Sequence, residues 1–249
     1  MCRKITNKYF LLTLSLALFA VTGMHAETPL SVENTSTGSK EVEAYIDLTS
    51  FDEICSDVVA NICIVQSDQS RIVAKGPEQI ISHIEAKVKE GVLRITVNKK
   101  LRMQNGESLS LTVYTPTLCR IHQIGVGSIK CSDRLDTPMM EIVNDGVGSV
   151  QIKDLHCDTL TVVSNGVGGI DLDGCTKAAV YKSDGVGSIK AYGMESEYTQ
   201  VKLNGVGSIQ CHASKQLDAR NNGVGSIRYR GNPESTNIHT DGVGTIRHK

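Results

Sequence analysis

The sequence contains few of the large aromatic side chains on which most globular cores depend. Trp is absent, and aromatic residues make up only 4% of the 249 positions. Because aromatic side chains normally supply much of the volume of a compact core, their scarcity argues against a bulky globular interior. Glycine is abundant, with 23 residues, and Val and Ile are frequent. This composition favours stacked β-structure.

A basic stripe and a second long apolar segment are also missing. The first apolar run, residues 10–21, follows three basic residues and is too short to span a bilayer as a helix. Together with Met24-His25-Ala26 it predicts a signal peptide over residues 1–26. Its removal leaves 23 basic and 27 acidic residues, a formal charge of −4. We expect an exported protein, in the periplasm, on the outer-membrane surface or outside the cell, with no nucleic-acid partner and no transmembrane segment.

The cysteines show no arrangement typical of a metal site. Seven remain after residue 26, without a CxxC motif or a Cys/His cluster of zinc spacing. An odd number leaves at least one thiol unpaired or paired between chains. Cys157 and Cys175 lie nine and ten residues before successive glycine motifs, so a disulfide between neighbouring turns is possible. Buried thiols that act as small apolar side chains are the alternative.

A short glycine motif is repeated seven times in the second half of the chain. GVGSI or a close variant recurs at steps of 21, 20, 19, 20, 18 and 19 residues, and six of the seven copies follow Asp or Asn. An Asx–Gly pair favours the positive φ of a tight turn, so each motif predicts a corner. The glycines assigned to these turns are Gly125, Gly127, Gly146, Gly148, Gly166, Gly168, Gly185, Gly187, Gly205, Gly207, Gly223, Gly225, Gly242 and Gly244.

Strand periodicity surrounds each motif. Apolar residues recur five and three positions before the Asx, as Met140 and Ile142 do before Asp145. A unit of about 20 residues cannot bury its own apolar face, whereas stacked units can. The fold class predicted is all-β: a single-stranded right-handed β-helix, or β-solenoid, of about seven rungs with ladders of equivalent residues. We expect Val147 and Val150 to fill its core. A left-handed helix is the alternative, disfavoured because the repeat length drifts and no six-residue period is present.

Residues 41–118 lack the motif but alternate in short strand-like runs. Gly91 marks a hairpin turn, and Pro77 starts a helical turn through Ile81. We expect this β-rich part to extend or cap the solenoid, because an exposed rung invites edge-to-edge pairing. The predicted strands are residues 42–48, 57–65, 70–76, 86–98 and 109–116. Residues 27–40 are expected to form a flexible polar lead, and residues 119–249 the repeat β-helix.

Two stretches taken together resemble one known family. Residues 51–97, with FDEI, GPEQII and EGVLRI, look like its opening, and LTVYTPTLCRIHQIGVGSIKC, residues 111–131, is similar to its transition into Gly-x-Gly repeats. The family is the "putative auto-transporter adhesin, head GIN domain" family of Bacteroidetes, and the resemblance covers residues 51–246. It implies a secreted, non-enzymatic β-helical protein with an adhesive role, and it carries no catalytic residues over.

Other interpretations of the glycine motif have less support. A phosphate-binding loop needs a helix after the glycines, whereas strand-like residues follow here, in seven copies. Calcium requires six to eight oxygen ligands, and the Asx positions supply only the carboxylates of Asp145, Asp184 and Asp241 among neutral Asn. An Asn/Asp ladder with hydrogen bonds along the stack explains the pattern more simply. We therefore predict no metal and no cofactor, with a calcium site at these three residues as the alternative.

No catalytic residues are predicted. Ser128 and Lys130, like Ser188 and Lys190, share a strand face but have no third group fixed by the sequence, and the histidines are scattered. The function predicted is a non-enzymatic binding module or adhesin of the cell envelope, with a surface glycan or a protein as partner. The alternatives are an envelope scaffold that self-associates through its solenoid ends, and a polysaccharide-active β-helix enzyme.

Overall fold

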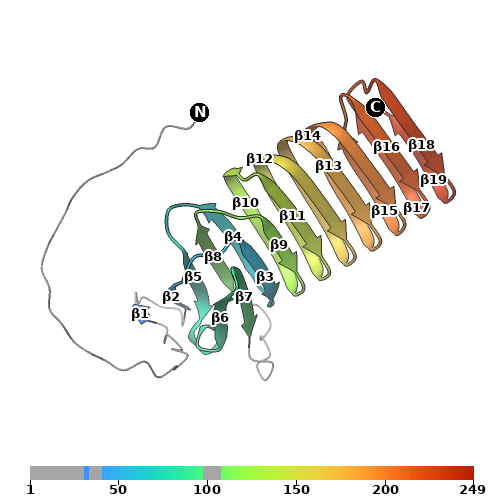
Figure 1. The fold of residues 1–249 in the computed structure, drawn as a ribbon. Coiled ribbons are helices and arrows are strands. Elements are labelled where there is room, and N and C mark those ends of the chain that lie inside the picture. The colour runs from blue at the N-terminus through green and yellow to red at the C-terminus, as the bar shows by residue number, and fades with distance from the viewer. Residues whose placement is uncertain (1–30, 34–40, 98–107) are drawn as a thin grey trace, which may run out of the picture.

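The computed structural model describes residues 31–33, 41–97 and 108–249, and these form an all-β solenoid (Figure 1). The signal peptide predicted for residues 1–26 lies outside the described residues. Within the predicted polar lead, β1 (Ser31–Glu33) pairs antiparallel with β2 (Glu41–Asp47), and the rest of the lead lies outside the described residues. No helix of the described residues is long and apolar enough to cross a membrane.

Each rung consists of a strand that enters a glycine corner and a strand that leaves it. Equivalent strands pair in parallel and in register, for example Val126 with Val147 and Val147 with Val167, which confirms the solenoid and its ladders. The right hand of the helix stays a prediction. The strands of the repeat region are β9 (Arg120–Gln123), β10 (Val126–Asp136), β11 (Met139–Asn144), β12 (Val147–Ser164), β13 (Val167–Ser183), β14 (Val186–Leu203), β15 (Val206–His212), β16 (Gln216–Asn221), β17 (Val224–Arg230), β18 (Ser235–Thr240) and β19 (Val243–His248).

The solenoid begins before the first glycine motif. β3 (Glu53–Asp57) pairs with β9, and β4 (Asn61–Gln66) pairs with β10, both in parallel. The predicted strand 57–65 is therefore wrong: residues 58–60 form a corner between two strands. DVVANI, residues 57–62, occupies the positions that DGVGSV holds in a later rung, and the expected boundary at residue 118 does not mark the first rung.

The first rungs do not stack in chain order. β7 (Val92–Val97) and β8 (Ser110–Thr115) pair with the outer sides of β3 and β4, while β9 and β10 pair with the inner sides. The rung that contains β3 and β4 is therefore first along the chain but second in the stack. Its corner at residues 58–60 is far from the first glycine motif in sequence, yet it lies directly beside the corner of that motif.

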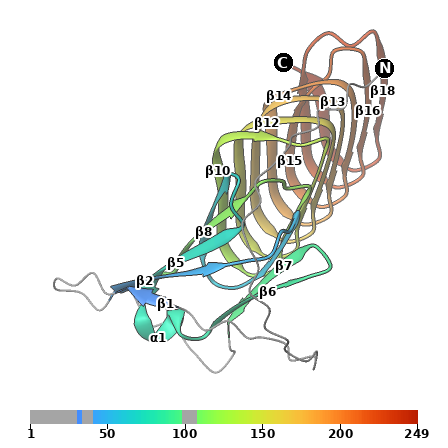
Figure 2. The same ribbon diagram turned by 60° about the vertical axis from the view of Figure 1, so that its left-hand side comes forward.

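Antiparallel strands close the N-terminal end of the stack (Figure 2). β5 (Arg71–Pro77) pairs with β8, β2 pairs with β5, and β6 (Ile84–Lys89) pairs with β7 across the hairpin at Gly91. Between them the helical turn α1 (Glu78–Ile81) buries two isoleucines. In the described part of the chain, the outermost parallel strands at this end, β7 and β8, are therefore both covered by an antiparallel neighbour.

Apolar ladders fill the interior. The Ile or Val that ends each motif and the residues three and five positions before the Asx are buried in all but the last rung. Tyr181, fully buried, is the largest of these side chains. In the last described rung Ile238 is 43% exposed, because no further rung packs on β18 and β19 in the described part of the chain.

Candidate functional surface

Both glycines of the corner are needed for close approach of the rungs, and the second is also needed for its positive φ. A Cβ atom on Gly146 would lie 2.1 Å from the carbonyl oxygen of Gly125 in the preceding rung, and one on Gly148 would lie 1.8 Å from that of Gly127. Gly148 also has a φ of +151°, and the second glycine has a φ of +131° to +151° in all seven motifs. We expected the positive φ at the glycine directly after the Asx; it occurs two residues later, and the first glycine serves close approach.

Buried polar side chains hold the corner from inside. The Asn144 Oδ1 atom accepts the N–H of Gly146 at 3.1 Å, and Asn221 accepts the N–H of Gly223 at 3.2 Å. Both asparagines are fully buried. The residue before the Asx was not singled out in the sequence, because Ser or Leu stands there in other rungs.

The exposed Asx residues form a hydrogen-bonded ladder. The Asn165 amide donates to Asp145 at 2.7 Å, and Asn204 donates to Asp184. Asp145 accepts hydrogen bonds from Asn165 and from His122. Both bonds, that of Asn165 most of all, hold the pKa of the Asp145 carboxyl below its usual value. These side chains bind one another along the stack.

The three carboxylates of the calcium alternative do not meet. Asp145, Asp184 and Asp241 each stand at least two rungs apart, roughly 10 Å or more at the strand spacing, with Asn at the corners between them. Within the described chain, the potential ligand atoms close to one another belong instead to Asp52, Glu53 and Cys119. The geometry therefore gives the three corner aspartates no shared cation.

The valines of the motif form an exposed ridge along the corner. Val147 is 51% exposed, whereas Val150 is fully buried, so the expectation that both fill the core is wrong for Val147. The chain turns outward between the two glycines, and neither glycine has a side chain to cover the valine. Contiguous exposed apolar surface marks interaction sites in many soluble proteins. The valine ridge consists of Val59, Val126, Val147, Val167, Val186, Val206, Val224 and Val243.

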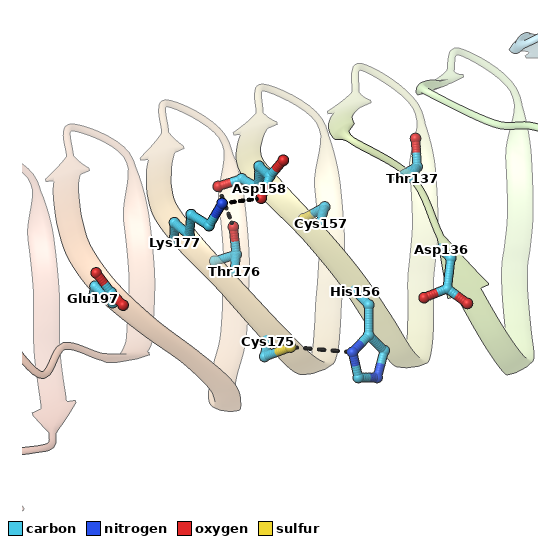
Figure 3. Close-up of a pocket in the computed structure, with 9 residues that line it drawn as sticks. All are labelled: Asp136, Thr137, His156, Cys157, Asp158, Cys175, Thr176, Lys177 and Glu197. Carbon is cyan, nitrogen blue, oxygen red and sulfur yellow. Dashed lines mark hydrogen bonds and ion pairs between the residues drawn. The ribbon is translucent and has the colours of Figure 1, made fainter. Parts of the chain in front are cut away.

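A shallow hollow of about 500 Å³ lies over neighbouring rungs away from the corner (Figure 3). Cys157 and Cys175 both line it, but they do not form the disulfide considered from the sequence. Cys157 is paired in register with Thr176, and Cys175 with His156. Because one residue separates the two cysteines in register, their side chains point to opposite faces of the strands. Both thiols are free in the structure.

Unpaired basic side chains gather on the outward face of the last rungs. The Arg230 guanidinium lies 4.4 Å from the ring centre of Tyr192, and the Lys249 Nζ atom lies 5.2 Å from it. Arg228 is paired in register with Arg247. This cationic face consists of the exposed side chains of Lys190, Arg228, Arg230, Arg247 and Lys249 around Tyr192.

The cationic face differs from the same wall of the solenoid in the two rungs directly before it. There Lys153 lies 3.1 Å from Asp171 and 2.9 Å from Asp173, so its charge is balanced. Among the residues that the structure describes, none of the five basic groups lies within 4.0 Å of a carboxylate. Like charges on adjacent strands repel, so the pairing of Arg228 with Arg247 is unfavourable within the protein, and the Tyr192 ring offsets the repulsion only for Arg230 and Lys249.

Sequence reasoning missed this face because its members are spread over residues 190–249. The repeat alignment nevertheless contained a signal: the residue after the buried Ile is Lys190, Gln210, Arg228 and Arg247 in four successive rungs. The convergence of Arg230 and Lys249 on Tyr192 appears only once the strands are stacked.

Comparison with known proteins places the chain in a family. The sequence profile of the family described as "Putative auto-transporter adhesin, head GIN domain" matches residues 50–233. The crystal structure of a putative adhesin from Bacteroides fragilis is 33% identical, with a TM-score of 0.83 over 85% of this chain and 98% of that chain. No curated protein matches the sequence.

Two crystal structures from Parabacteroides distasonis share the fold at lower identity. One, a putative lipid binding protein, is 21% identical with a TM-score of 0.68, and the other, a putative adhesin, is 20% identical with a TM-score of 0.62. Each comparison covers 84% of this chain and 97% of the other. The match of the profile over most of the sequence, together with the B. fragilis structure, shows that the chain belongs to the putative auto-transporter adhesin, head GIN domain family.

Proposed function

We propose that this protein is an exported, non-enzymatic binding module of the cell envelope that adheres to an anionic surface glycan. The observation that carries the proposal is the cationic face, five basic side chains without carboxylate partners on a chain whose overall formal charge is negative. Such a local excess of one sign attracts and orients ligands of the opposite sign.

The arrangement suits carboxylate, sulfate or phosphate groups carried on a chain. Arg228 and Arg247 lie on adjacent strands, about 4.8 Å apart at the strand spacing, and each offers a planar fork of donors. The contacts of Arg230 and Lys249 with the Tyr192 ring limit their motion before a ligand arrives. A preorganised row of cations favours a polymer with repeated negative charge over a neutral sugar.

The alternatives differ in their support. The valine ridge favours a protein partner as the second candidate, because an exposed apolar ridge is typical of protein contacts. End-to-end self-assembly has less support, since antiparallel strands β2, β5 and β6 cover the parallel rungs at the N-terminal end. A polysaccharide-cleaving site at the cationic face has less support, because no described carboxylate lies within 4.0 Å of its five basic groups.

The proposal is tested with an array of neutral, uronic-acid-containing, sulfated and phosphorylated glycans. We expect binding to anionic glycans that weakens as salt is raised, and a loss of about tenfold or more for Arg228→Glu/Arg230→Glu. Lys130→Glu/Lys202→Glu is the matched control, because it makes the same charge change away from this face, and Lys130 occupies the same position on its rung as Arg228. Equal binding of neutral glycans, or equal losses in both variants, would contradict the proposal.

A further inference from the structure

A thiol, an imidazole and a carboxylate are joined by hydrogen bonds on the surface of β12 and β13. Figure 3 shows two of them, Cys175 and His156, with the bond between them. The Cys175 Sγ atom lies 3.1 Å from His156 Nδ1, and His156 Nε2 lies 2.6 Å from Asp154 Oδ1. Cys175 is exposed, and the side chains of His156 and Asp154 are 31% and 47% exposed. This thiol site stands apart from the cationic face and has no part in the adhesion proposed above.

The strand register creates this geometry. His156 and Cys175 are opposite one another on adjacent parallel strands, so their side chains point the same way about 4.8 Å apart. Asp154 lies two residues before His156 and so shares its face. Gly174, with a φ of +138°, brings its backbone so close to Leu155 that a Cβ atom would lie 2.0 Å from the Leu155 carbonyl oxygen. The three groups are therefore held by the backbone of two rungs.

The hydrogen bonds determine where the protons lie. An ionised Asp154 carboxylate can only accept, so His156 Nε2 must carry a proton. In a neutral imidazole Nδ1 is then the acceptor, and the Cys175 thiol donates to it. This is the tautomer in which His156 can remove the thiol proton, with Asp154 orienting the ring. Asp154 touches neither sulfur nor ligand, and is therefore a positioning residue.

The charges around the thiol do not by themselves explain its activation. Arg134 is paired in register with Asp154 and donates to both carboxylate oxygens of Asp136. On the other side, Glu195 is the register partner of Cys175 and contributes a negative charge. Because cations and carboxylates both face the thiol, we assign its activation to the imidazole and not to a positive environment.

None of the other cysteines in the described chain has this arrangement. Burial raises the pKa of Cys131 to about 11 and that of Cys211 to about 12, so both stay protonated in the core. Burial also raises the pKa of Cys157. Cys63 is exposed, as Cys175 is, but no imidazole is hydrogen-bonded to it in the described structure. Cys63 is therefore the natural internal control for Cys175.

We propose that Cys175 is a nucleophilic thiol that undergoes exchange with disulfides of small molecules or partner proteins, with His156 as its base. His156 Nδ1 takes the thiol proton, and the Cys175 sulfur attacks one sulfur of a disulfide. The S–S bond of the ligand breaks as the bond to Cys175 forms, and the departing sulfur takes the proton from His156. Cys175 is oxidised to a mixed disulfide while one ligand sulfur is reduced to a thiol, so atoms and electrons balance.

Disulfide exchange fits this location better than acyl transfer. Exchange needs a thiolate with solvent access, which an exposed thiol on a strand surface provides. Acyl transfer would also need hydrogen-bond donors placed for an oxyanion. The signal peptide predicted from the sequence would place the protein outside the reducing cytoplasm, where disulfides are available as co-reactants.

The test follows mixed-disulfide formation on the folded protein with oxidised glutathione, by timed peptide mass spectrometry at pH 7. We expect Cys175 to react about tenfold or more faster than Cys63. His156→Gln should reduce Cys175 to the rate of Cys63 without changing Cys63 itself. His122→Gln, which removes another histidine paired with an aspartate, is the matched control and should have no effect.

Asp154 requires a separate readout, because its loss could also disturb packing. Asp154→Ala should slow Cys175, and Asp154→Asn should restore part of the rate, because the amide oxygen can still accept from His156 Nε2. Thermal unfolding of each variant checks that it is folded. Equal rates at Cys175 and Cys63, or an unchanged Cys175 rate in folded His156→Gln, would overturn the proposal.

Discussion

The glycine corner and the remainder of each rung face different physical demands. At the corner the backbones of successive rungs approach so closely that carbonyl oxygens occupy the space of a Cβ atom, and the same residues recur seven times. Away from the corner the register shifts, as it does between Ile152 and Leu155, and the residues differ from rung to rung. The residues that repeat are therefore the ones that stacking requires. The cationic face and the thiol site are built from the residues that vary between rungs.

The earliest rung supports this distinction. Val58 and Ala60 stand at the positions where later rungs have glycine. The crowding at each later corner comes from the rung on its N-terminal side, as the Val58 carbonyl crowds Gly125. A corner therefore needs glycine because of the rung on its N-terminal side. The corner at residues 58–60, which precedes the first glycine motif in the stack, need not meet the same requirement.

The largest expected effect comes from breaking the corner itself. Gly187→Ala would place a Cβ atom 1.7 Å from the Gly168 carbonyl oxygen at a φ of +148°. We expect it to lower the free energy of unfolding by about 3 kcal/mol or more, measured by urea denaturation. Gly169→Ala is the control, because its Cβ atom would lie in ordinary contact, 3.8 Å from the Ser188 carbonyl oxygen, and should change stability by less than about 0.5 kcal/mol.

An intermediate loss of stability is expected when a residue inside a rung is changed, compared with a residue exposed at the corner. Ile170→Thr replaces a side chain that is 1% exposed and puts a hydroxyl into the apolar ladder, so we expect a loss of about 2–3 kcal/mol. Val167→Thr, three residues earlier on the valine ridge, should cost less than about 0.5 kcal/mol, because Val167 is 49% exposed. Similar midpoints of denaturation for the two variants would contradict the outward orientation of the ridge.

The smallest expected effect concerns the Asx ladder. Because hydrogen bonds from Asn165 and His122 lower the pKa of Asp145 in the folded protein, they stabilise the fold at pH values above the ordinary carboxyl pKa. That contribution is lost as the pH falls through the lowered folded pKa. The side chain is 36% exposed, so solvent screening keeps the contribution below about 1 kcal/mol.

Asp145→Asn measures this contribution. The variant should unfold slightly more easily than the parent protein at pH 7, and the difference should disappear in acid, below the ordinary carboxyl range near pH 4. Denaturation curves at a series of pH values give both quantities. A difference that grew as the pH fell would show that the carboxylate opposes the fold.

Much of the fold could be predicted from the sequence, because each repeat contains the residues that form one rung and its corner. Asx, two glycines and flanking apolar residues at strand spacing predicted the rungs, the buried ladders and the corner. The same pattern did not reveal that Val147 points outward, since that depends on which of the two glycines takes the positive φ. The pattern also did not predict the first corner, at residues 58–60, because that corner lacks glycine.

The candidate sites were less predictable because they depend on register away from the corner. Cys157 and Cys175 lie nine and ten residues before their glycine corners, and the pairing of the two strands sets Cys157 opposite Thr176 and His156 opposite Cys175. The sequence alone determined the repeat, and with it the solenoid, because a glycine is required wherever two backbones meet at a corner. Only the tertiary structure decided which variable side chains become neighbours, because the loops between corners differ in length and their irregularities set the register.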